Sequence, residues 1–170
     1  FITNALTTTT QRYLSYHHGR QDSEQLRLVF GNSMLLHLII GGCLALILSA
    51  LGPWISHEFL NIDPARQNAA LMVYIAAVIM LMLTFITAPI RALFVARENI
   101  VYTSTIDVMD GLMRLAIAII LSKLTCDHLT AYANMLVGIS IINLLAFAIY
   151  AAWKFPEFHW PRWKEFDKKH

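Results

Sequence analysis

The apolar residues of this chain gather in long blocks, and each block is about as long as a lipid bilayer is thick. A helix needs about 20 mostly apolar residues to cross a hydrocarbon core of about 30 Å. Four segments approach that length: 32–51, 69–90, 106–122 and 131–153. The blocks lack the period-two alternation of membrane-barrel strands, and a helix satisfies its own backbone hydrogen bonds inside lipid. The sequence therefore predicts an all-α, polytopic bundle of transmembrane helices.

The composition excludes an ordinary soluble domain. Hydrophobic residues make up 57% of the chain and charged residues 14%, whereas soluble domains average about 45–50% and about 25%. The formal net charge is only +2, so nucleic acid is not expected as a partner. Membrane lipids are the partners that this composition predicts.

The positively charged residues alternate between the two sides of the predicted bundle. Ten of the thirteen Lys and Arg residues fall in the segments 12–31, 91–105 and 154–170, and two fall in 52–68 and 123–130. Cytoplasmic loops of membrane proteins carry the excess of Lys and Arg. The first three segments are therefore expected in the cytoplasm. The last of them mixes basic and aromatic side chains, which predicts an interfacial linker on the inner leaflet.

Residues 1–16 have the pattern of the end of a further helix. An apolar stripe runs along one side, and polar residues such as Asn4, Thr7 and Gln11 occupy much of the rest. So polar a helix is expected to meet water or other helices. The chain starts at Phe1 without a recognisable targeting segment. We therefore expect it to be an internal or truncated part of a longer, transporter-sized protein.

Three ionisable residues interrupt the third apolar block: Asp107, Asp110 and Arg114. Asp110 and Arg114 are four residues apart and share one helical face, with the acid in the favourable N-terminal position. A lone Arg at the centre of a span costs about 2.5–3.5 kcal/mol on insertion scales, and charged groups inside membranes commonly mark substrate or ion pathways. Two interpretations stay open: a substrate or ion site in a cavity, or an ion pair that locks this helix to a neighbour.

Arg91 follows Pro89 at the cytoplasmic end of the second full span and is a further candidate for a water-filled cavity. No other pattern indicates a chemical site. The seven His residues are scattered and do not form a metal-ligand set; His37, inside a span, is expected to make a hydrogen-bonded helix contact. We find no nucleophile–base pair, phosphate-binding loop or zinc spacing. No enzyme, metal or cofactor is therefore expected.

Two groups of residues carry a resemblance to a known superfamily. The first is NALTTTTQRY at 4–13 followed by HGRQD at 18–22, and the second is APIRAL at 88–93 with ARE at 96–98. Their order and spacing resemble the first half of a multidrug/oligosaccharidyl-lipid/polysaccharide exporter, and the likeness runs through nearly all of the chain. It implies a bundle of about 12–14 helices in two lobes with a central cavity and alternating access.

On this resemblance, residues 1–16 end helix two, the four spans are helices three to six of one six-helix lobe, and the other lobe is missing here. The polysaccharide-flippase branch is favoured, which implies a bacterial inner membrane and a lipid-linked oligosaccharide as substrate. Arg114 or Arg12 would meet its diphosphate. The alternative is a cation-coupled drug antiporter, in which Asp107 or Asp110 would bind H⁺ or Na⁺. A membrane-embedded glycosyl- or phosphotransferase and a structural subunit are weaker alternatives.

Overall fold

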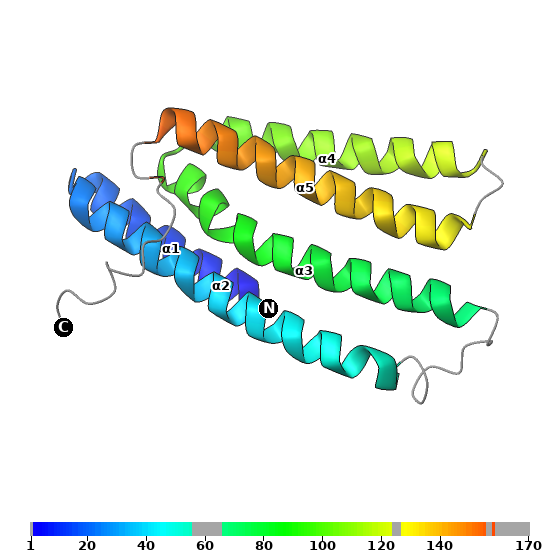
Figure 1. Cartoon of the computed structure of the whole chain (residues 1–170). Helices are drawn as coiled ribbons and strands as arrows, with labels where there is room; N and C mark the ends of the chain where they lie inside the picture. The colour runs from blue at the N-terminus through cyan, green and yellow to red at the C-terminus, as the bar shows by residue number, and fades with distance from the viewer. Residues whose placement is uncertain (1, 56–65, 124–126, 156–157, 159–170) are drawn as a thin grey trace.

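The computed structural model describes residues 2–55, 66–123, 127–155 and 158. Within these ranges the regular elements are five α-helices, which account for almost every described residue (Figure 1). They are α1 (Ile2–Gly19), α2 (Ser23–Trp54), α3 (Gln67–Ala96), α4 (Ile100–Leu121) and α5 (His128–Lys154). The prediction of an all-α chain is confirmed for this part of the protein.

Helix α3 lies at the centre of the bundle. It packs most extensively against α2 on one side and α5 on the other, while α1 contacts both α2 and α3, and α4 packs mainly on α5 (Figure 1). The α1–α2 and α3–α4 connections and the C-terminal end of α5 lie at one end of the bundle. Lys and Arg residues are concentrated in the segments that contain or follow these three regions. We call this end the basic end.

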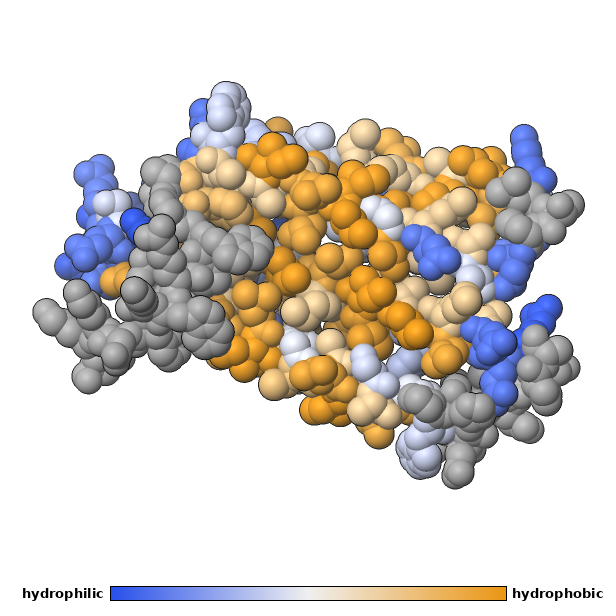
Figure 2. Space-filling view, viewed as in Figure 1, coloured by the Kyte–Doolittle hydropathy of each residue, from blue (hydrophilic) through white to orange (hydrophobic). Residues whose placement is uncertain are grey.

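Three of the described helices are long and apolar enough to cross a membrane: Ser23–Gly52 of α2, all of α3 and all of α5. Figure 2 shows hydrophobic residues over the middle of one face and hydrophilic residues at its two ends. Both observations indicate a membrane-embedded protein. Helix α4 is not among the three, because Asp107, Asp110 and Arg114 interrupt its 22 residues. Of the four membrane spans that the sequence predicts, the structure thus supports three.

The helices extend beyond the apolar blocks at several of their ends. Residues 1–16 were expected to end a helix, and α1 continues to Gly19. Helix α2 begins well before residue 32 because Asp22 caps it; the Asp22 Oδ1 accepts a hydrogen bond from the Gln25 N–H at 3.1 Å. It also runs through Gly52 to Trp54. Polar first turns are compatible with a helix wherever the helix leaves the hydrocarbon.

Aromatic rings form the packed core at the basic end. Phe94 of α3 is fully buried, and its ring lies 5.0–5.4 Å from the rings of Tyr102, Phe147, Tyr150 and Phe155. Ring centroids at such spacing attract one another beyond simple burial. This cluster, which we call the aromatic core, fastens the end of α3 to the start of α4 and the end of α5.

A buried polar chain joins α1 to α2. The hydroxyl groups of Thr10 and Ser33 are 2.7 Å apart, and the Nδ1 of His37 donates to the Ser33 carbonyl at 2.8 Å. All three residues are buried. The prediction of a hydrogen-bonded helix contact for His37 is met only in part. Its hydrogen bond stays within α2, its Nε2 has no partner among the described residues, and the Thr10–Ser33 bond is the one that crosses to α1.

Close approach of α2 to α3 depends on Gly41. A Cβ at this position would lie 2.7 Å from the Cβ of the buried Phe85. We therefore expect Gly41→Ala to lower the free energy of unfolding by about 1–3 kcal/mol, measured by titrating the purified protein with SDS and following helicity. The neighbouring Gly42→Ala is the matched control, because a Cβ there meets no atom within 4 Å. Equal losses in both variants would contradict this account.

Candidate functional site

A polar cleft of about 410 Å³ lies among α1, α3, α4 and α5. Its lining combines four charged side chains with hydroxyl and amide groups. The lining residues are Thr3, Asn4, Thr7, Leu83, Thr84, Thr87, Ala88, Arg91, Asp107, Asp110, Arg114, Ser140, Asn143 and Phe147. The prediction that the polar side of residues 1–16 meets water or other helices is borne out where α1 borders this cleft.

The first charged group in the cleft joins α4 to α5. The Arg114 Nε donates to the Asp110 Oδ2 at 2.6 Å, as their spacing on one helix predicts. The Asn143 Nδ2 of α5 donates to the Asp110 Oδ1 at 2.5 Å. The Asp110 side chain is 21% exposed. One carboxylate thus pairs with a cation on its own helix and holds the neighbouring helix.

The second charged group joins α4 to α3. Both terminal nitrogens of Arg91 donate to the Asp107 carboxylate, each at 2.7 Å, in the planar two-bond geometry that suits a guanidinium. The Arg91 Cζ also lies 5.3 Å from the centre of the Phe147 ring of α5, within range of a cation–π contact. Arg91 of α3 therefore contacts α4 and α5 across the cleft.

The cleft offers two kinds of polar group, guanidinium donors and hydroxyl acceptors. A guanidinium has five N–H donors, and neither Arg uses all of them on its carboxylate; the Arg91 side chain is 39% exposed and that of Arg114 45%. The hydroxyls of Thr7, Thr84, Thr87 and Ser140 each donate to a backbone carbonyl of their own helix.

The two kinds of group differ in what they can bind. Because the four hydroxyl protons are already donated to backbone carbonyls, the hydroxyl oxygens are left to act as hydrogen-bond acceptors. The guanidinium groups therefore suit the anionic part of a ligand, and the hydroxyl oxygens suit its O–H donors. The carboxylates of Asp107 and Asp110 could alternatively hold a small cation, although each already has a guanidinium partner.

Four of the five sequence candidates meet in this cleft, namely Arg91, Asp107, Asp110 and Arg114. The fifth, Arg12, is exposed on α1 and is not part of the lining. Asn143 was missed, although an amide inside an apolar block was a signal for it. The four hydroxyl residues of the lining, Thr7, Thr84, Thr87 and Ser140, were also missed. Thr and Ser are ordinary in membrane helices, and only the packing shows which of them share a cavity.

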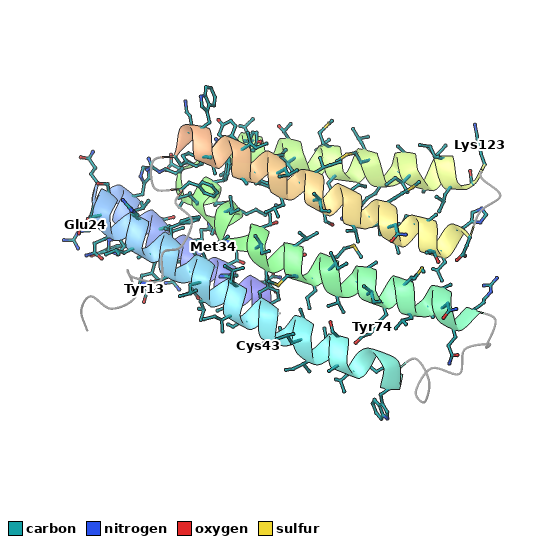
Figure 3. All side chains as sticks on the ribbon, viewed as in Figure 1. Tyr13, Glu24, Met34, Cys43, Tyr74 and Lys123 are labelled. Atoms are coloured by element: carbon teal, nitrogen blue, oxygen red, sulfur yellow. The ribbon has the colours of Figure 1, made fainter. Side chains whose placement is uncertain are left out.

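The charged side chains at the two ends of the bundle lie away from this group. Figure 3 places Glu24 at the basic end and Lys123 at the opposite end. In the described ranges no three His, Cys, Asp or Glu side chains come together as metal ligands, and Cys43 is an exposed free thiol. The polar cleft is thus the part of the described structure with the most concentrated chemistry. No protein-family model matches this chain, and no curated protein or solved structure is significantly similar to it.

Proposed function

We propose that this chain forms most of one lobe of a membrane transporter, a flippase that moves lipid-linked oligosaccharide across a bacterial inner membrane by alternating access. The observation that carries the proposal is the polar cleft. Two Arg and two Asp residues from α3 and α4 meet there inside a bundle of apolar helices. Charged groups at membrane depth are costly, and a pathway for a polar substrate is a common reason for them.

In this proposal α4 is a fourth span. Its 22 residues would extend about 33 Å at about 1.5 Å per residue, close to the thickness of the hydrocarbon core. Its charged residues turn to the cleft, while Val108, Met109 and Leu112 are exposed on another part of its surface. The helix would thus be apolar towards lipid and polar towards the pathway. The distribution of Lys and Arg along the chain supports an orientation in which the C-terminal tail is cytoplasmic.

The two kinds of group in the cleft match the two parts of such a substrate. Guanidinium groups bind phosphate oxygens strongly through charge-assisted hydrogen bonds, so Arg91 and Arg114 would hold the diphosphate. The hydroxyl oxygens of Thr7, Thr84, Thr87 and Ser140 are left as acceptors. Sugar hydroxyls are donors of the complementary kind. Membrane lipids and a second lobe would complete the pathway.

Export of surface polysaccharide in the cell that makes this protein tests the proposal. We expect Arg114→Ala and Arg91→Ala each to lower export at least about tenfold at equal protein level in the membrane, the effect of losing one charge-assisted bond to an anion. Arg12→Ala and Lys123→Ala remove cations outside the cleft and are expected to leave export unchanged. Unchanged export in both cleft variants would refute the role of the cleft in flipping.

A cation-coupled drug antiporter is the second candidate, because the Asp110 carboxylate and the Asn143 amide lie together in the cleft. It ranks below the flippase since a coupling H⁺ or Na⁺ would compete with Arg114 for the same carboxylate. Loss of proton- or sodium-dependent drug efflux in Asp110→Asn, with polysaccharide export intact, would favour the antiporter.

A further inference from the structure

A second pocket, of about 230 Å³, lies at the basic end, away from the polar cleft. It forms where α1 ends, α2 begins and α3 ends. His17, His18, Asp22, Ser23, Leu26 and Arg97 line it. None of these residues borders the polar cleft, so what this pocket binds does not depend on the transport proposal.

This pocket lies at the ends of two candidate membrane-spanning helices. The candidate span of α2 begins at Ser23 and that of α3 ends at Ala96, next to Arg97. A ligand between these two points would lie in the headgroup layer, where basic residues meet lipid phosphates. The floor of the pocket is the buried side chain of Leu26.

The polar groups of this pocket favour an anion. The rings of His17 and His18 both belong to its lining, and the ring nitrogens of His can donate hydrogen bonds. The guanidinium of Arg97 is held over the Phe155 ring, 5.8 Å from its centre. The first turn of α2 adds N–H groups and the positive end of the helix dipole. The carboxylate of Asp22 is the opposing charge in this lining, and its Oδ1 accepts the Gln25 N–H as the cap of α2.

We infer that this pocket binds a phosphate group at the inner membrane surface. His17 and His18 approach from α1, Arg97 from α3, and the N-terminus of α2 closes the third side. The phosphate could belong to an anionic phospholipid headgroup or be free inorganic phosphate. The chemistry that recognises it is the same in both cases.

Binding to the purified protein in neutral detergent tests the inference, with dihexanoyl phosphatidylglycerol, dihexanoyl phosphatidylcholine and inorganic phosphate as probes. We expect the anionic lipid to raise the thermal unfolding temperature, and the zwitterionic lipid to do so less. His17→Ala/His18→Ala should weaken this binding at least about tenfold, and Arg97→Gln by a similar factor. His128→Ala/Lys123→Gln removes the same kinds of groups at the opposite end and should leave binding unchanged.

The outcomes distinguish a lipid headgroup from free phosphate as the ligand, and both from a pocket that binds no anion. Lipid binding that inorganic phosphate does not displace assigns the pocket to a lipid headgroup. A rise in unfolding temperature with inorganic phosphate alone, lost in the His17→Ala/His18→Ala variant, assigns it to free phosphate. If the native protein binds neither anion, or if the variants bind as the native protein does, the inference is wrong. Helicity measured for every variant, with His18→Gln as a milder change, shows whether weaker binding reflects the pocket or misfolding.

Discussion

Asp110→Ala is expected to lower the free energy of unfolding by about 1–3 kcal/mol. A hydrogen bond to a charged group contributes about 1.5–3 kcal/mol, and the bond from Arg114 counts for less because the Arg114 side chain is 45% exposed. The change deprives Arg114 of its carboxylate and removes the acceptor of Asn143, so α4 loses its hold on α5. SDS titration of the purified protein, followed by helicity, measures the effect.

The double variant Asp110→Ala/Arg114→Ala shows how much of the loss comes from leaving Arg114 without its carboxylate partner. With no uncompensated charge left, it is expected to be more stable than Asp110→Ala alone. Glu24→Ala is the control, because Glu24 is exposed in the first turn of α2, and a change within about 0.5 kcal/mol is expected. A double variant less stable than the single one would show that Arg114 is held by other groups.

Phe94→Ala is expected to have the largest effect on stability, about 3–5 kcal/mol. Phe94 is 0% exposed and its ring contacts four other rings of the aromatic core, which come from α4, α5 and the residue directly after α5. Its removal leaves a cavity where three helix ends are joined, and packing contacts are the main attraction between helices in lipid. Thermal unfolding in detergent measures the loss.

The control for Phe94→Ala is Val101→Ala, at the start of α4. Val101 is 80% exposed, so the expected change is within about 0.5 kcal/mol. Phe94→Leu, which keeps apolar volume but not ring contacts, should fall between the two. If Phe94→Ala were as stable as Val101→Ala, the aromatic core would not join the three helices energetically.

The helices and the contacts within each helix could be predicted from the sequence. Apolar blocks of membrane length predicted α2, α3 and α5, and spacing alone predicted that Asp110 and Arg114 would pair. Such contacts need no knowledge of any other helix. Helix ends were predicted less well, because a helix continues past the hydrocarbon wherever caps such as Asp22 support it.

The contacts between helices could not be predicted. The sequence grouped Asp107 with Asp110 and Arg114 in one apolar block, and the structure pairs Asp107 across the cleft with Arg91 of α3. Arg12 was a candidate for the same site as Arg114, and α1 presents it on an exposed face outside the cleft. Both outcomes depend on how far each helix is rotated about its axis. That rotation follows from side-chain packing over the full length of the helix.

The sequence by itself determined that this protein is helical, apolar enough for a membrane, and charged at one place in α4. The tertiary structure decided that this charge belongs to a cleft shared by α1, α3, α4 and α5, and that the hydroxyls of its wall remain as acceptors. The physical reason is the distance along the chain over which each effect acts. Hydropathy and helical spacing act within one segment, whereas a cleft exists only where the side chains of separate segments fail to fill the space between them.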